Sequence, residues 1–224
     1  SRKVGSVFQN PRSQFFCLDT SSELAFGCEN LGMPVEQINE RVKYAAEELE
    51  LENLLDRDIF KLSGGEKQRI ACGSVSAMLP DIIVLDEPTS NLDAESIELL
   101  KRILVLWKKQ NKTIIIAEHR LYWLKDICDR VVYLSDGKIQ MDIPMRELTD
   151  YSEQKMEKLG LRSINADFQS QINKSDWSPP SQNEPDTITL KDYVFAYDVK
   201  TILDIRKLQI PRNEVIAITG QNGA

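Results

Sequence analysis

Two adjacent carboxylates, Asp86 and Glu87, directly follow the short apolar run Ile82–Leu85. Such a run predicts a strand buried on both faces, and open α/β sheets bind ligands at the carboxyl ends of their strands. One carboxylate there could hold Mg²⁺ through water, and the other could orient a water beside the γ-phosphate of a nucleotide. Asp86 suits the first task and Glu87 the second. A solvated strand end ahead of Pro88 is the plain alternative.

A second candidate site is a glycine turn, Ser63-Gly64-Gly65-Glu66, that precedes a predicted helix from Lys67. The N–H groups and the positive dipole end of a helix N-terminus attract anions. Ser63 and Glu66 also have the spacing of a capping box, which needs no ligand. A capping box does not require Gly64 and Gly65, whose entropic cost would be explained by the close approach of a ligand.

Two further polar residues follow short apolar stretches. His119, the only histidine, comes directly after Thr113–Ala117, in a position parallel to that of Asp86. A lone histidine is more often structural than functional, but this place at a strand end favours function. Gln9 follows the apolar pair Val7-Phe8 and by itself would be an ordinary loop residue.

The elements that must position these residues alternate between strands and helices from Val4 to about Asp150. This alternation predicts an α/β domain with a mostly parallel sheet. Pro34 suits the first turn of one helix, and Asp93 can cap another. The apolar stripes of these two helices are Ile38, Val42, Ala45 and Leu49, and Ile97, Leu100, Leu104 and Trp107. A turn at Ser135-Asp136-Gly137 predicts a hairpin between Val131–Leu134 and Lys138–Gln140.

The sequence changes character after this domain. The stretch 161–186 is rich in Ser, Asn, Gln and Pro, which is typical of a linker. We therefore expect a first domain over residues 1–150, a linker over 151–186 and the β-rich start of a second domain over 187–224. Its expected strands are Thr187–Leu190, Tyr193–Tyr197 and Val215–Thr219.

The composition disfavours two classes of protein, those that bind nucleic acid and those that span a membrane. The chain has 224 residues and a net charge of −7, which gives no basic footprint for nucleic acid. Its longest apolar runs are far shorter than a membrane span. The four cysteines form no CxxC pair, so we expect reduced thiols in a cytosolic protein.

Together these features resemble the nucleotide-binding domain of ABC transporters, through almost all of residues 4–150. The resemblance implies a P-loop NTPase fold with flanking helices and a helical signature subdomain. Its five motifs occur in the family's order: the Q-loop glutamine at Gln9, the signature at Leu62–Glu66, Walker B at Ile82–Glu87, the D-loop at Ser90–Asp93 and the switch histidine at His119.

A narrower resemblance lies between the Q-loop and the signature. The segments Asn10–Phe16 and Glu23–Gly32 look like the energy-coupling factor branch, whose ATPases drive vitamin and metal-ion uptake in prokaryotes. This implies a peripheral protein on the cytoplasmic face of the membrane. Its implied partners are an integral membrane coupling subunit and a substrate-binding membrane subunit, without nucleic acid.

The Walker A loop of the family, G-x-x-x-x-G-K-[ST], does not precede Gln9. The segment Gly220-Gln221-Asn222-Gly223-Ala224 instead matches its first five positions. Ahead of it, Tyr197 matches the aromatic residue that stacks on adenine, or it packs at a strand end. Both ends of the sequence suggest a piece of a tandem ATPase with two nucleotide-binding domains.

The resemblance implies ATP hydrolysis with Mg²⁺. Glu87 would activate the water, His119 would contact the γ-phosphate, and Asp86 and Gln9 would hold the metal. In head-to-tail pairing, Ser63, Gly64, Gly65 and Glu66, with Asp93, would bind the ATP cradled by the loop from Gly220 to Ala224. One alternative is a soluble ABC ATPase that acts on ribosomes or DNA. The other is an inert fragment, since the Walker A lysine is missing.

Overall fold

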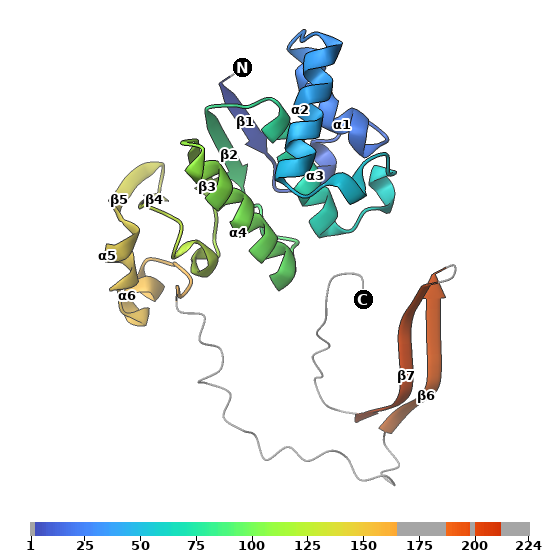
Figure 1. Cartoon of the computed structure of the whole chain (residues 1–224). Coiled ribbons are helices and arrows are strands. Elements are labelled where there is room, and N and C mark those ends of the chain that lie inside the picture. The colour runs from blue at the N-terminus through green and yellow to red at the C-terminus, as the bar shows by residue number, and fades with distance from the viewer. Residues whose placement is uncertain (1–2, 165–186, 198–199, 212–224) are drawn as a thin grey trace. The chain divides into compact units, whose positions relative to one another are not determined.

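The computed structural model describes residues 3–164, 187–197 and 200–211 (Figure 1). The chain divides into two compact units, Ser1–Ala166 and Asp167–Ala224. The first unit has the predicted mixed α/β architecture, and the second contributes a hairpin to the described residues.

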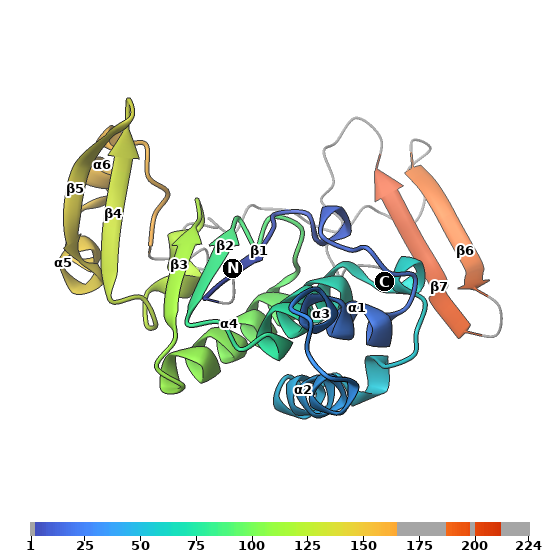
Figure 2. The ribbon, with the colours of Figure 1, turned by 90° about the horizontal axis from the view of Figure 1, so that it is seen from above.

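A three-stranded parallel sheet organises the first unit. Its strands are β1 (Val4–Val7), β2 (Ile82–Asp86) and β3 (Thr113–Ala117), in the order β1-β2-β3 (Figures 1 and 2). The register pairs the last residue of β1 with Leu85 and pairs Asp86 with Ala117. The carboxyl ends of all three strands therefore meet at one edge.

The burial of β2 differs from the prediction that both of its faces are covered. Ile83 and Leu85 are buried, whereas Ile82 and Val84 are half-buried. On the less buried face the neighbouring strand β3 exposes 54% of Ile115. In the part of the chain that the structure describes, one face of the sheet is therefore covered better than the other.

Two helices pack on the sheet, α3 (Gly64–Ala77) against β1 and α4 (Ala94–Lys109) against β3 (Figure 2). Asp93 caps α4 by accepting a hydrogen bond from Ser96 N at 2.8 Å. The apolar stripe of α4 is buried, which confirms the predicted helix. Its buried residues are Ile97, Leu100, Ile103, Leu104 and Trp107.

A helical layer formed by α1, α2 and α3 extends from the sheet (Figure 1). Asp19 caps α1 (Thr20–Asn30). Pro34, which was expected in the first turn of a helix, is the residue just before α2 (Val35–Glu48). Along the stripe of α2, Ile38, Ala45 and Leu49 are buried, while Val42 is half-buried. The short 3₁₀ helices that link this layer are η1 (Pro11–Ser13), η2 (Glu52–Leu54) and η3 (Ile59–Lys61).

The predicted hairpin is formed by β4 (Arg130–Ser135) and β5 (Lys138–Pro144). The turn residues Asp136 and Gly137 have φ values of 52° and 69°, as a two-residue hairpin turn requires. Around the hairpin lie η4 (Leu121–Leu124), α5 (Met145–Thr149) and α6 (Glu153–Lys158).

The helix α6 lies inside the stretch 151–186 that we expected to be a linker. Ser152 caps it, and Met156 on α6 is buried in the large apolar core that also contains residues of the sheet, α3 and α4. Ile164 joins the same core. Packed structure therefore continues beyond Asp150, because a few apolar residues recur among the polar ones.

In the second unit β6 (Thr187–Tyr197) and β7 (Lys200–Pro211) form an antiparallel pair. The single strand β6 takes the place of two shorter expected strands, and Asp192 between them has a φ of 46°. The expected strand Val215–Thr219 lies outside the described residues.

Candidate functional site

The side chain of Glu87 lies between the side chains of Gln9 and His119. Gln9 Nε2 donates a hydrogen bond to Glu87 Oε2 at 2.8 Å, and His119 Nε2 lies 2.9 Å from Glu87 Oε1. The three residues follow β1, β2 and β3, whose parallel pairing brings their ends together. The structure therefore unites the two carboxylate oxygens of Glu87 with an amide and an imidazole.

The backbone of Glu87 is strained. Its φ of 40° lies in the left-handed region, which residues other than glycine seldom adopt. The strained peptide is held from both sides, since Glu87 N donates to Ala117 O at 2.8 Å and Ser90 N donates to Glu87 O at 3.2 Å. Strain of this kind at the end of a strand is a frequent property of functional sites.

This cluster is open to solvent. The Glu87 side chain is 30% exposed and that of His119 is 75% exposed. Asp86 is exposed at the last position of β2. A ligand can therefore reach all three residues from outside the core.

The donor atoms at this edge suit Mg²⁺. Because Gln9 uses its amide nitrogen for Glu87, its amide oxygen is available as a ligand, and Asp86 supplies a carboxylate. Mg²⁺ prefers oxygen ligands and takes one or two carboxylates together with water and substrate phosphates. Among the residues with a described placement, no three His, Cys, Asp or Glu side chains form a metal-binding group.

The glycine turn contains the capping box that the sequence allowed. Glu66 N donates to Ser63 Oγ at 3.2 Å, and Ser63 N donates to Glu66 Oε2 at 2.7 Å. Burial opposes the charge of Glu66, but hydrogen bonds from Ser63 and Arg57 outweigh it and hold the pKa of Glu66 below its usual value. Ser63 and Glu66 thus have a structural role at the start of α3.

The two glycines differ in what surrounds them. A Cβ on Gly65 would lie 2.2 Å from Ser96 Oγ and 3.0 Å from Ser96 Cβ, so this glycine is needed for helix packing. A Cβ on Gly64 would meet only Asn91 O, at an ordinary 3.4 Å. Ligand approach is therefore not needed to explain Gly65, and it remains an explanation for the exposed Gly64.

A hollow of about 330 Å³ joins the two candidate regions. It lies between the loop 9–12, the start of α3 and the loop 88–92, and both Gln9 and Gly64 line it. Lys67 on its wall is buried, and its Nζ donates to the backbone oxygens of Leu62 and Phe60. Burial, with a smaller effect from Arg12, lowers the pKa of Lys67.

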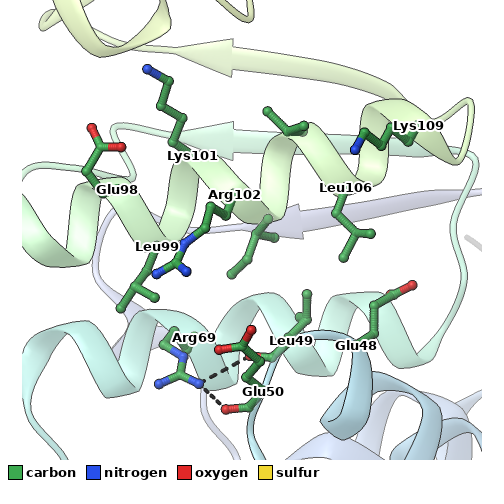
Figure 3. Close-up of a pocket in the computed structure, with 12 residues that line it drawn as sticks. Glu48, Leu49, Glu50, Arg69, Glu98, Leu99, Lys101, Arg102, Leu106 and Lys109 are labelled. Atoms are coloured by element: carbon green, nitrogen blue, oxygen red, sulfur yellow. Dashed lines mark hydrogen bonds between the residues drawn. The ribbon is translucent and has the colours of Figure 1, made fainter.

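A larger hollow of about 490 Å³ lies elsewhere, between α4 and the end of α2 (Figure 3). Arg69 donates to Leu49 O at 3.2 Å and to Glu50 O there, which ties α3 to the end of α2. The hollow is also lined by residues of α4, including Leu99, Arg102 and Leu106. None of the predicted site residues lines it.

Of the residues predicted to bind ATP, some have other contacts in the structure and some lie outside the described residues. Asp93 caps α4, so its carboxylate already has a backbone partner. Tyr197 is the last residue of β6, paired with Lys200. The loop residues Gly220, Gln221, Asn222, Gly223 and Ala224 lie outside the described residues.

Two residues beside the cluster, Thr89 and Glu118, were not predicted from the sequence. Thr89 Oγ1 donates to Glu118 Oε2 at 2.6 Å, and Glu118 also accepts from the backbone N of His119. Glu118 could have been found, because it follows a predicted strand just as Asp86 and Glu87 do. Thr89 gives no such signal in the sequence.

A family model described as "ABC transporter" matches residues 1–90. An ABC transporter ATP-binding protein of Treponema denticola is 44% identical over 225 residues, covering 100% of this chain and 46% of that protein. One from Methanosarcina acetivorans is 45% identical over 163 residues, covering 71% and 26%. The chain thus spans about half or less of the length of these relatives.

The fold is also similar to a solved structure, CbiO1 from Clostridium perfringens, which is described as part of the ABC transporter complex CbiONQ. The TM-score is 0.62 at 32% identity, over 72% of this chain and 64% of that one. No helix among the described residues is both long and apolar enough to cross a membrane. With its parallel sheet and strand-end cluster, the chain belongs to the family of ABC transporter ATP-binding proteins, which have the P-loop NTPase fold.

Proposed function

We propose that the protein containing this chain binds and hydrolyses ATP. The observation that carries the proposal is the position of Glu87, whose two carboxylate oxygens face Gln9 and His119 at 2.8 and 2.9 Å. A carboxylate placed at an open sheet edge between two polar groups can orient a water molecule. Membership of the ABC family makes the γ-phosphate of ATP the natural target of that water.

In the proposed reaction Glu87 takes a proton from water as the water oxygen bonds to the γ-phosphorus. The bond between that phosphorus and the oxygen bridging to the β-phosphate breaks, which releases ADP and phosphate. His119 contacts the γ-phosphate, and Gln9 fixes the orientation of Glu87. Each carboxylate oxygen of Glu87 has one partner in this structure and keeps a further lone pair, so Glu87 can accept a hydrogen bond from the water while both partners stay in place.

Mg²⁺ is the proposed cofactor. When bound, it would neutralise charge on the phosphates, and Asp86 and the amide oxygen of Gln9 would hold it. The support is the donor chemistry at this edge, an exposed carboxylate and an amide oxygen beside Glu87.

The glycine turn is proposed to bind a second ATP across a head-to-tail pair of nucleotide-binding domains. Gly64 supports this role, since it is exposed, lines the hollow and has no close neighbour that demands a glycine. Ser63 and Glu66 at the start of α3, and Asp93 at the start of α4, would also contact this second ATP. The phosphates would be cradled by the loop from Gly220 to Ala224, with Tyr197 against the adenine.

Hydrolysis is proposed to power an importer of the energy-coupling factor type for a vitamin, a metal ion or a similar small solute. The similarity to CbiO1, which is part of a transporter complex, supports this reading. The protein would then lie on the cytoplasmic face of a prokaryotic membrane, bound to a coupling subunit and a substrate-binding subunit.

Exposed apolar side chains supply a surface for the coupling subunit. Phe16 and Leu18 are each 74% exposed and Phe60 is 70% exposed. They lie on adjoining segments, because Ile59 N donates to Leu18 O at 3.0 Å. We name these three residues the apolar ridge. Buried Glu23 fixes its start by accepting from Phe16 N and Cys17 N, both at 2.9 Å.

The substitution Glu87→Gln in the full-length protein tests the ATPase proposal. We expect turnover to fall by roughly 10²-fold or more while ATP binding is retained, since the amide keeps the shape of the carboxylate but cannot take the proton. The matched control is Glu47→Gln on the exposed side of α2, which should leave turnover unchanged. Unchanged turnover in Glu87→Gln would refute the role of Glu87.

The ridge is tested by the pair Phe16→Asp and Leu18→Asp in the full-length protein. Both should abolish copurification with an integral membrane subunit, because a charge cannot be buried in an apolar contact without a large cost. Val35→Asp, at an exposed apolar position on α2, is the control and should copurify normally. Copurification with RNA in place of a membrane subunit would favour a soluble ABC ATPase.

The 224 residues contain no complete G-x-x-x-x-G-K-[ST] sequence. We therefore expect weak or no ATPase activity from this chain alone. Activity well above background in the purified chain would contradict that expectation.

A further inference from the structure

The carboxylate of Glu118 connects the loop after β2 with the loop after β3. Thr89 Oγ1 donates to Glu118 Oε2 at 2.6 Å. On the other oxygen, His119 N and Arg120 N donate to Glu118 Oε1 at 2.8 and 3.0 Å. One side chain thus satisfies a hydroxyl of one loop and two backbone N–H groups of the other.

These hydrogen bonds are strong and well anchored. Hydrogen bonds to an ionised acceptor are shorter and about twice as strong as neutral ones. Thr89 is fully buried, and its carbonyl accepts from Leu92 N at 3.2 Å, so the hydroxyl is presented from a fixed turn. The Glu118 carboxylate is therefore bound to a hydroxyl whose position in the loop after β2 is fixed.

His119 depends on this anchor. Its side chain is 75% exposed, so packing does little to fix the imidazole. Its orientation instead follows from its backbone, which Glu118 holds, and from the 2.9 Å contact with Glu87. Since Thr89 follows Glu87 in the same loop, Glu118 fixes the position of one partner relative to the other.

We infer that Glu118 is a positioning residue that, through Thr89, holds His119 in register with Glu87. The inference rests on the proposed ATPase function for its kinetic consequence, but not for its structural one. A misplacement of about 1 Å between reacting groups can cost on the order of 10²-fold in rate. Loss of the anchor should therefore slow hydrolysis more than it weakens ATP binding.

The kinetic test compares Glu118→Ala with Glu118→Gln in the full-length protein. The alanine variant should lose roughly 10- to 100-fold in kcat with little change in KM. The glutamine variant should recover most of that loss, since its oxygen can accept both N–H groups and its amide can donate to Thr89. Thr89→Val and Thr89→Ser form a second pair, in which only valine should lower kcat. Glu47→Ala is the control.

A spectroscopic test uses the fact that His119 is the only histidine among the 224 residues. The imidazole ¹⁵N resonances of the chain therefore report on one side chain. In Glu87→Gln these resonances should move, because the acceptor has lost its charge. Glu118→Ala and Thr89→Val should move them in the same direction, as the contact loosens, whereas Glu118→Gln and Thr89→Ser should stay close to the parent chain.

The outcomes separate the two proposals. Absence of ATPase activity in the full-length parent protein would refute the proposed function, and unchanged turnover in Glu87→Gln would refute the role of Glu87. In either case the resonances of His119 would still decide the role of Glu118. Unshifted resonances in Glu118→Ala overturn the positioning role, as does a loss of activity that matches the loss of folded protein. Equal kcat losses in Glu118→Ala and Glu118→Gln would also overturn it, because they would require a carboxylate and not an anchor.

Discussion

Gln9 and Glu87 are 78 positions apart in the chain, yet Gln9 Nε2 donates to Glu87 Oε2 at 2.8 Å. The contact follows from the pairing of two neighbouring parallel strands, in which Val7 is opposite Leu85. Each residue stands two positions beyond this pair, at the carboxyl edge where open α/β sheets bind ligands. The relationship between the two side chains is thus built into the register of β1 and β2.

Replacing Gln9 by Ala removes this hydrogen bond and one proposed oxygen ligand. We expect turnover of the full-length protein to fall about tenfold or more, since Glu87 loses a partner that orients it. The measurement is steady-state ATPase activity at saturating ATP. Gln37→Ala, an exposed amide on α2, is the control and should keep full activity. Parent-like turnover in Gln9→Ala would show that the contact has no catalytic value.

The two glycines of the turn should respond in opposite ways to alanine. Gly65→Ala should lower the free energy of unfolding by about 1–3 kcal/mol, because the new methyl group overlaps Ser96. Gly64→Ala should not destabilise the fold, since its nearest neighbour is at 3.4 Å, but should lower ATPase activity. Chemical unfolding and activity assays separate the two.

The overlap at Gly65 can be relieved from the other side. The double variant Gly65→Ala with Ser96→Gly should recover part of the lost stability, after allowance for the effect of Ser96→Gly alone. If the effects of the two changes on the free energy of unfolding were simply additive, Ser96 would not be the group that the methyl group at position 65 overlaps.

The capping box makes stability depend on pH. Burial opposes ionisation, but the hydrogen bonds from Ser63 and Arg57 hold the pKa of Glu66 below its ordinary value of 4.5. A carboxyl with a lowered pKa in the folded state adds stability above that ordinary value, and this stability is lost as pH falls through the folded-state pKa. The difference in unfolding free energy between the parent chain and Glu66→Gln should therefore narrow below about pH 4.5.

The same titration of a variant that changes no titratable group is the control. Gln37→Ala, at an exposed amide on α2, should keep a constant difference in unfolding free energy from the parent chain over the same range. A constant difference for Glu66→Gln from neutral to acid pH would mean that the cap does not depend on the charge.

The cysteines should differ in reactivity. Burial raises the pKa of Cys72 to about 12, and Cys72 is fully enclosed in the core. Thiolate is the reactive form, so Cys72 should resist a maleimide at neutral pH until the chain is unfolded. Cys17 and Cys128, which are only partly buried, should react first. Peptide mapping by mass spectrometry after brief labelling gives the order.

Periodicity predicted the elements of the first unit well. The stripe from Ile97 to Trp107 and the cap at Asp93 define α4, and the Asp136-Gly137 turn defines the hairpin. These predictions were correct because each depends on neighbours within a few residues. The predicted burial of β2 on both faces was wrong for the described residues, since burial depends on what other segments cover a strand.

The same difference between local and distant information applies to the site. The sequence predicted that three polar residues, Gln9, Glu87 and His119, follow strands, and the structure brings them within hydrogen-bond distance. The close packing of Gly65 against Ser96, which gives this glycine a structural reason beside its proposed role in ligand binding, was not predicted. The hydrogen bond between Thr89 and Glu118 was also missed. Both depend on pairs of distant residues, and a single sequence gives no information on which distant residues meet.

The contact between Gly65 and Ser96 joins the first turns of α3 and α4 with no side chain between them at the glycine. Close-packed groups resist compression and transmit displacement. The first turns of α3 and α4 can therefore approach each other this closely only while residue 65 carries no side chain.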